Sequence, residues 1–301
     1  MRLKSAVARP IYITSALPRS ADRRYSAYFH HGAKMTSAAP FLSVIIPTHK
    51  RPVLLERALE SIKSQESPLP YEIIVVSDEA SAADDEVCRR LLGPDDIHIR
   101  RNGPPGPSAS RNLGIELASG RHLMFLDDDD AWQPGLLSRL AGVQEIKESR
   151  FAYFDCQVVK ENRSGPHPEF ISDHLLNTAG RLNEMVYVQN QIHMSCLFFP
   201  RALIGSTRFD PYMRAYEDWD FMLAIFRKEM PAHVPVQGSI VYETPDESSD
   251  RRGASSNATN ANAIMDYLYV YRRHPAPSEA LRQQRAALMQ RVGMPLPADL
   301  L

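Results

Sequence analysis

Cysteines and long apolar runs are both scarce in this chain, and each scarcity excludes a class of protein. The 301 residues include only three cysteines, Cys88, Cys156 and Cys196, which are widely spaced and form no CxxC pair. Neither a disulfide framework nor a zinc knuckle is therefore indicated, and this cysteine usage fits a reducing cytoplasm best. Apolar runs never approach the roughly 18 residues that a membrane-spanning helix needs.

Net charge is also almost absent. The chain has 35 basic and 36 acidic residues, a formal net charge of -1, so it offers no global field for nucleic acid and we expect no such partner. A hydrophobic fraction of 44% with 24% charged residues is ordinary for a globular protein. Any site for an anion must therefore be local.

Residues 1–40 differ from the rest because they mix arginines with small and aromatic residues and carry one acid, Asp22. This segment lacks the sustained apolar core of a secretory signal. We expect a disordered or flexible leader.

Alternating strand and helix patterns follow, and they predict a parallel α/β sheet flanked by helices over residues 41–245. A polar, irregular stretch at 160–183 reads as a loop over the site, and 246–301 as a mobile loop followed by two helices. We expect strands at 41–47, 71–76, 97–99, 122–126, 151–155, 194–200 and 239–242. We expect helices at 52–62, 83–92, 111–118, 134–147, 217–226, 263–271 and 278–292. Ser108 or Ser110 is the expected cap of the third helix and Gly120 its end.

Four consecutive aspartates, Asp127 to Asp130, come directly after the apolar run Leu123–Leu126. Carboxylates this close repel one another, so a cation is expected to neutralise them. Oxygen ligands favour magnesium, manganese or calcium, and such ions often share their coordination with phosphate oxygens. The alternative is an acidic loop that faces water. The position of the quartet at the carboxyl end of a strand, where ligands collect in open α/β sheets, favours a site.

Four segments, taken in order, resemble a family 2 glycosyltransferase of the GT-A fold. They are 45–52 (IIPTHKRP), 74–78 (IVVSD), 125–132 (FLDDDDAW) and 217–220 (EDWD), and the resemblance covers about residues 41–245. It implies a Rossmann-like, mostly parallel sheet, with helices beyond it at the C-terminus.

The resemblance also implies a nucleotide site. Pro47 and Thr48 would contact the base, with Arg51 close by, and Asp78 would hydrogen-bond the uracil or ribose. Arg111 would approach the nucleotide or diphosphate. Without the family, Pro47 is equally a strand terminator, Asp78 a helix cap and Arg111 an exposed helical arginine.

At the quartet, the family pattern is Asp-x-Asp-Asp followed by a residue and often tryptophan, here Trp132. Asp127 would then face the ribose, and Asp129 would bind Mn2+ or Mg2+ and the diphosphate. Asp128 fills the variable position, where we expect a dispensable residue, and the register leaves open which of Asp127 and Asp129 is the main metal ligand.

The acidic pair Glu217–Asp218 resembles the pair whose aspartate deprotonates the acceptor hydroxyl, so we assign Asp218 as the base. Acids in a first helical turn also complement the helix dipole without any catalytic duty. Arg251 and Arg252 would grip the diphosphate from a mobile loop. His193 and His233 are better explained as structural residues, and Trp132 and Trp219 as either sugar-stacking or core residues.

The resemblance predicts an inverting, metal-dependent transferase that uses a nucleotide-sugar donor, UDP-sugar first, and a carbohydrate or glycolipid acceptor. It also suggests bacterial cell-surface polysaccharide or lipopolysaccharide synthesis, in the cytoplasm or with peripheral contact at the inner face of the membrane. Two alternatives stay open: a sugar-phosphate nucleotidyltransferase, although 47–52 lacks its glycine-rich loop, and a non-catalytic nucleotide-sugar or metal-binding module.

Overall fold

The computed structural model describes residues 25–28, 39–244 and 259–301. Its strands are β1 Tyr25–Tyr28, β2 Leu42–Thr48, β3 Tyr71–Ser77, β4 Ile97–Arg101, β5 His122–Phe125, β6 Ala131–Trp132, β7 Ala152–Asn162, β8 Glu169–Leu176, β9 Leu197–Pro200 and β10 Ala232–Glu243. Its helices are α1 Pro52–Lys63, α2 Ala82–Leu91, α3 Pro107–Leu117, α4 Leu136–Gly142, α5 Gln144–Lys147, α6 Arg201–Ile204, α7 Glu217–Phe226, α8 Thr259–Arg273 and α9 Glu279–Arg291. Three short 3-10 turns complete the set: η1 Glu184–Tyr187, η2 Met194–Cys196 and η3 Ala298–Leu300.

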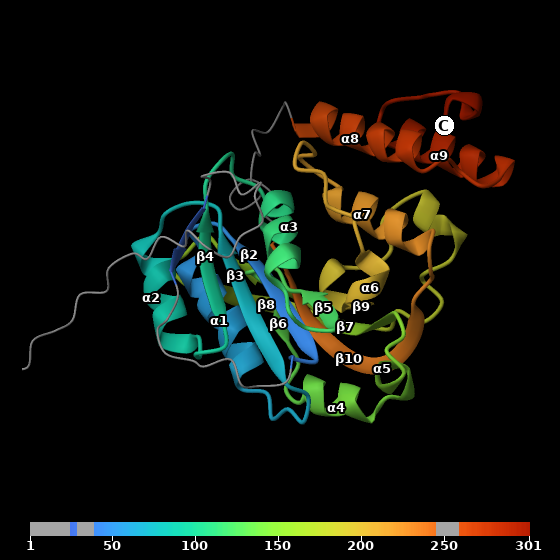
Figure 1. The fold of residues 1–301 in the computed structure, drawn as a ribbon. Helices are drawn as coiled ribbons and strands as arrows, with labels where there is room; N and C mark the ends of the chain where they lie inside the picture. The colour runs from blue at the N-terminus through green and yellow to red at the C-terminus, as the bar shows by residue number, and fades with distance from the viewer. Residues whose placement is uncertain (1–24, 29–38, 245–258) are drawn as a thin grey trace, which may run out of the picture.

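These elements form the predicted α/β fold, with a mostly parallel central sheet between helices (Figure 1). The strand order is β1-β4-β3-β2-β5-β9-β7-β10-β6, and β8 pairs with β7 beside this path. Strands β4, β3, β2 and β5 run parallel, so their carboxyl ends meet at one edge. β9 then pairs antiparallel with both β5 and β7 and joins the two halves of the sheet.

The hydrophobic core is continuous from the sheet to the C-terminal helices. β-branched residues fill β2 and β3, as expected for strands with both faces covered. Val270 and Tyr271 of α8, with Leu281 and Met289 of α9, belong to the same buried cluster. Within the described residues, no helix combines the length and the apolar character needed to cross a membrane.

Several local expectations were wrong. The helix expected at 134–147 is two helices, because Val143 is extended (φ -81°, ψ 134°) between α4 and α5. Residues 160–183 are not simply irregular, since β7 runs on to Asn162 and β8 pairs with it. Almost the whole of β8 is exposed, so it lacks the apolar alternation by which a strand is recognised.

The third helix starts earlier than expected. Pro107 occupies its first turn and Gly106 precedes it, so Ser108 and Ser110 lie inside α3 and neither caps it. Its C-terminal cap is Ala118. Most of the expected leader lies outside the described residues, and residues 25–28 within it form β1, antiparallel to β4. The expected mobile loop, with Arg251 and Arg252, also lies outside them.

Gly120 has a packing role instead. A Cβ built on it would lie 2.7 Å from the backbone nitrogen of Ser43 and 2.8 Å from the carbonyl carbon of Leu42. The backbone of a central strand cannot retreat from such a contact. Only glycine therefore fits between α3 and β2.

We expect Gly120→Ala to lower the free energy of unfolding by about 1–3 kcal/mol, the usual range for overpacking. Gly142→Ala is the matched control, because a Cβ there meets nothing within 4 Å. Urea unfolding of both variants measures the difference. Equal stability of the two variants would contradict the packing argument.

Candidate active site

The aspartate quartet leaves the sheet at the carboxyl ends of β2 and β5. Asp130 N donates to Asp127 O at 3.0 Å, so the quartet forms a tight turn. Each of its four side chains has a different set of partners, although Asp128 and Asp129 share Arg51. The structure therefore separates residues that the sequence presents as equivalent.

Asp128 is the member that anchors the turn. Its Oδ2 accepts Thr48 Oγ1 at 2.8 Å and His49 N at 3.3 Å, and its Oδ1 lies 3.2 Å from Arg51 Nη1. The carboxylate is buried. Asp128 thus ties the quartet to the end of β2, and its buried bonds count against the prediction that it is dispensable.

Asp129 is held by arginines on two sides. Its Oδ2 accepts Arg163 Nη1 at 2.9 Å and Arg51 Nη1 at 3.3 Å, and its carbonyl accepts Arg57 Nη2 at 2.7 Å. The buried Glu161 carboxylate accepts hydrogen bonds from Arg57 Nη1 at 2.7 Å and from Arg163 Nε at 2.7 Å. Glu161 is therefore the counter-charge that fixes the two arginines around Asp129.

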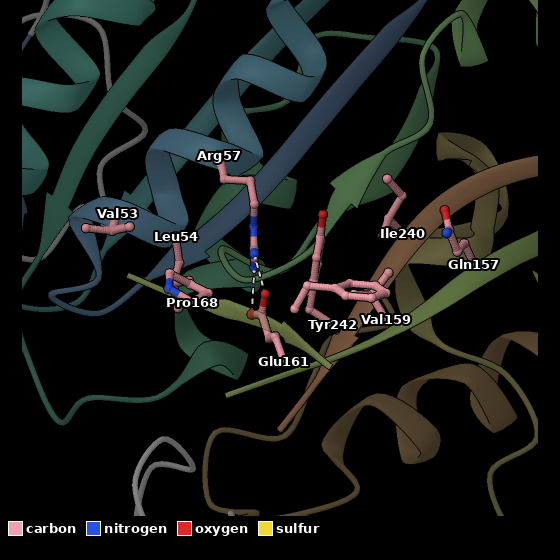
Figure 2. A pocket seen from close by; sticks show the side chains of 10 residues that line it. Val53, Leu54, Arg57, Gln157, Val159, Glu161, Pro168, Ile240 and Tyr242 are labelled. Atoms are coloured by element: carbon pink, nitrogen blue, oxygen red, sulfur yellow. Dashed lines mark hydrogen bonds and ion pairs between the residues drawn. The ribbon is translucent and has the colours of Figure 1, made fainter. Parts of the chain in front are cut away.

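Figure 2 shows the Arg57–Glu161 pair in a cavity of about 460 Å³ between α1, β7, β8 and β10. The Arg57 guanidinium stacks 3.5 Å from the centroid of the Tyr242 ring. Apolar side chains such as Val159 and Ile240 form the walls. These contacts hold the Arg57 guanidinium in place. Because Arg57 donates to the carbonyl of Asp129, they also hold the backbone at Asp129.

Arg111 joins the quartet to α7. Its Nη2 donates to Asp127 Oδ1 at 2.6 Å and its Nη1 to Glu217 Oε1 at 2.9 Å. Only 4% of the arginine side chain is exposed, against 40% for Asp127. Burial lowers the pKa of Arg111, but Asp127 and Glu217 raise it further than burial lowers it, so the guanidinium stays charged.

Asp218 is the residue after Glu217 in the first turn of α7. Its Oδ1 accepts Trp219 N at 2.7 Å, and its Oδ2 accepts Asn190 Nδ2 at 3.3 Å. Burial raises the pKa of Asp218 to about 7, with a further contribution from Glu217 and an opposing one from Arg111. The carboxylate can therefore exchange a proton near neutral pH.

Asp130 has a purely structural environment that the sequence analysis missed. Its Oδ2 accepts Ser195 Oγ at 2.9 Å and its Oδ1 accepts Tyr242 N at 3.1 Å. Burial first, and then the charges of Asp129 and Asp127, raise the pKa of Asp130 well above its usual range. Asp130 connects the quartet to β10 and does not face the site.

Asp78 lies deeper than expected. Its side chain has 0% exposure, its Oδ1 lies 2.6 Å from His49 Nδ1, and its Oδ2 accepts Gly106 N at 2.7 Å. A contact with a base or ribose would have to displace one of these partners. Pro47 is likewise buried within β2, where it pairs with Val76.

The structure brings together all predicted site residues that it describes, namely Pro47, Thr48, Arg51, Asp78, Arg111, Asp127, Asp128, Asp129, Glu217 and Asp218. It adds Arg57, Arg163, Glu161 and Asn190. No sequence signal identifies these four, because they come from three distant segments. His49, which contacts Asp78, could have been found from the sequence, because it directly follows Thr48 in the motif at 45–52.

The two tryptophans are core residues, and the two histidines are partly buried. Trp132 and Trp219 are fully buried, so neither can stack on a sugar. His233 Nε2 lies 2.9 Å from Asp155 Oδ1, and burial lowers the pKa of His193. A structural role for both histidines stays a prediction.

The donor set fits a hard cation that takes only part of its coordination from protein. No group of three or more His, Cys, Asp or Glu residues in the described part of the chain could enclose a metal ion. Asp127 and Asp129 present carboxylates at the exposed edge of the quartet. One or two carboxylates, completed by water and phosphate oxygens, is the usual protein share for Mg2+.

Known proteins resemble this chain in sequence and in fold. The profile of the family described as Glycosyl transferase family 2 matches residues 43–204. An uncharacterised glycosyltransferase of Bacillus subtilis, YwdF, is 30% identical over 224 residues, which are 72% of this chain and 79% of that protein. The chain belongs to glycosyl transferase family 2.

This glycosyltransferase has further relatives. A Campylobacter jejuni enzyme, GalNAc(5)-diNAcBac-PP-undecaprenol beta-1,3-glucosyltransferase, is 40% identical over 126 residues, 40% of each chain. Staphylococcus aureus TarS 1-349 in complex with UDP-GlcNAc shares the fold, with a TM-score of 0.57 and 16% identity over 83% of this chain and 72% of that one. The Pyrobaculum calidifontis mannosyltransferase PcManGT, in complex with GDP-Man and Mn2+, aligns with a TM-score of 0.52 and 17% identity over 87% of this chain and 78% of that one.

We expect Arg111→Met to destabilise this glycosyltransferase by about 3 kcal/mol, because the change leaves two carboxylates near each other without their buried cation. Arg121→Met is the control, since Arg121 is exposed and lies over the ring of Phe41. Urea unfolding at neutral pH measures both. A loss below about 1 kcal/mol for Arg111→Met would show that the bridge contributes little.

Proposed function

We propose that this glycosyltransferase moves a sugar from a nucleotide-diphosphate sugar to an acceptor hydroxyl with inversion, and that Asp218 is the base. One observation carries the proposal. Arg111 bonds to Asp127 on one side and to Glu217 on the other, so one buried cation joins the donor-side carboxylates to the acidic pair. The base then stands beside the carboxylates that would face the donor.

The chemistry is a single displacement. Asp218 takes the proton of the acceptor hydroxyl as that oxygen bonds to the anomeric carbon, and the bond from that carbon to the diphosphate oxygen breaks. Attack opposite the leaving group inverts the anomeric configuration. The pKa of about 7 suits Asp218 to this task, because a general base works best when its pKa is near the operating pH.

A divalent ion, Mn2+ or Mg2+, would neutralise charge on the leaving diphosphate when bound. Asp129, with Asp127, is the protein group that would hold it. Arg51 and Arg163 fix the Asp129 carboxylate in place before any ligand binds. Preorganised charges of this kind lower a barrier because they need not reorient during the reaction.

The donor and acceptor classes are supported by the relatives. TarS is seen with UDP-GlcNAc, which favours a UDP-sugar here, and PcManGT is seen with GDP-Man and Mn2+. The name of the Campylobacter enzyme describes a sugar chain on a lipid diphosphate, which favours a carbohydrate or glycolipid acceptor. We place the reaction in bacterial cell-surface polysaccharide or lipopolysaccharide synthesis, in the cytoplasm or at the inner face of the membrane.

We expect Asp218→Asn to reduce transfer at least about 100-fold, because general-base catalysis contributes about that much or more. Nucleoside diphosphate binding should stay within about twofold, since the hydrogen bonds of Asp218 go to Trp219 and Asn190. Assays would follow release of nucleoside diphosphate from a panel of nucleotide sugars with Mn2+, and a thermal-shift titration would follow binding. Asp95→Asn, at an exposed position, is the matched control.

Unchanged transfer by Asp218→Asn would remove its assignment as base. A wild-type protein that binds nucleotide sugars but never releases nucleoside diphosphate would instead indicate a non-catalytic binding module. Product stereochemistry, read from the anomeric proton coupling by NMR, tests inversion separately.

We expect Glu217→Gln to move the acid limb of the pH–rate profile to lower pH by about one unit. The base acts when deprotonated, so the rate rises with pH through its pKa of about 7. Glu217 raises that pKa, and removing its charge lowers it. Glu229→Gln, at an exposed position beyond α7, should leave the limb in place. A limb that moves to higher pH would contradict the electrostatic origin of the shift.

A further inference from the structure

The segment that leads into α7 has an uncommon backbone conformation. Tyr216, the residue before Glu217 and Asp218, has φ 59° and lies in the left-handed region. An aromatic residue rarely adopts this conformation unless its surroundings impose it. The direction in which α7 starts, and with it the position of Asp218, therefore depends on what holds Tyr216.

A single carboxylate of α8 holds the two residues before Tyr216. Asp266 Oδ2 accepts Arg214 N at 2.9 Å and Ala215 N at 2.8 Å. The ring of Tyr267, next along α8, packs edge-on against the Tyr216 ring at 4.6 Å between centroids. Charged acceptors form the stronger class of hydrogen bond to backbone N–H groups.

The first turn of α7 is held a second time, from the end of α8. Buried Asp220 lies 2.9 Å from His274 Nε2 and accepts Arg273 Nη1 at 2.9 Å. Between the two anchors, Trp219 is enclosed by tyrosines, with Tyr267 at 4.9 Å between ring centroids. Figure 1 shows α8 and α9 lying beside α7, apart from the central sheet.

The other partner of Asp218 is also fixed by the C-terminal helices. Arg285 of α9 has 0% exposure and donates to Tyr187 O at 2.8 Å and to His274 O at 2.7 Å. Tyr271 of α8 donates through its hydroxyl to Val188 O at 2.7 Å. These bonds fix the chain just before Asn190, whose side chain donates to Asp218.

We propose that α8 and α9 are the frame that positions the Asp218 carboxylate, and that Asp266 is a positioning residue for transfer. The inference rests on the proposed role of Asp218. Both segments that bond to Asp218, the start of α7 and the chain at 187–190, are held by this frame. Loss of this frame would lower the rate of transfer, because a displacement of a reacting group by about 1 Å can cost about 100-fold in rate.

The test compares Asp266→Ala with Asp266→Asn. The alanine variant loses both acceptor bonds, whereas the asparagine carbonyl can still accept from Arg214 N and Ala215 N. We expect Asp266→Ala to lower kcat about 100-fold with donor KM and UDP affinity within about twofold, and Asp266→Asn to recover most of the rate. Glu279→Gln, which removes an exposed carboxylate of α9, is the charge control and should match wild type.

Hydrogen exchange gives a readout that is independent of activity. In Asp266→Ala, backbone amides at 214–220 should exchange faster while those of β2 and β3 keep their protection. Wild-type kcat in Asp266→Ala would overturn the proposal, and so would an unrecovered rate in Asp266→Asn or a loss of protection throughout the sheet.

Should Asp266→Ala fail to fold, His274 provides the same test from the second anchor. His274→Gln can still donate to Asp220, and His274→Leu cannot, so only the leucine variant should lose kcat at unchanged UDP affinity. Equal kcat in the two variants would overturn the proposal. If wild type transfers no sugar at all, the proposed function fails, and faster exchange confined to 214–220 still decides whether the frame holds α7.

Discussion

A buried guanidinium that needs two counter-charges is the constraint on which the site depends. Arg111 sits in α3 with almost no exposed surface, and a charge so placed is tolerated only when it is paired. Its partners come from the turn after β5 and from the start of α7. The pairing requirement therefore fixes the distance between two parts of the chain about ninety residues apart, and it places the acidic pair at the quartet.

The same logic of charge pairing gives each aspartate of the quartet a separate task. Asp128 faces inward to the end of β2, and Asp130 faces β10, so both are occupied by the fold. Asp127 and Asp129 stay at the edge, each with an arginine partner. A run of four like charges is stable here because every member has a donor or a cation directed at it, which also preorganises the two that face outward.

The C-terminal helices belong to the site as much as the sheet does. They share the hydrophobic core, and through Asp266, Asp220 and Arg285 they hold the segments that contact Asp218. Partial burial of Asp218 raises its pKa. The raised pKa persists only while the carboxylate is held in that partly buried position. Catalytic residues on loops and helix starts need such support, because a loop alone does not hold a carboxylate to within an ångström.

The sequence by itself determined the α/β class, the order of most strands and helices, and most of the residues that the candidate site contains, because hydrophobic periodicity and the four short motifs are local signals. It also assigned the quartet to the end of a strand, where a parallel sheet gathers its ligands. The tertiary structure alone decided which aspartates face outward, that Asp78 is buried behind His49, and that Arg57, Arg163 and Asn190 join the site. It also showed β8 as an exposed edge strand, which no alternation of apolar residues marks. The reason is physical: burial and charge pairing depend on residues that meet only after folding, and no spacing along the chain records those meetings.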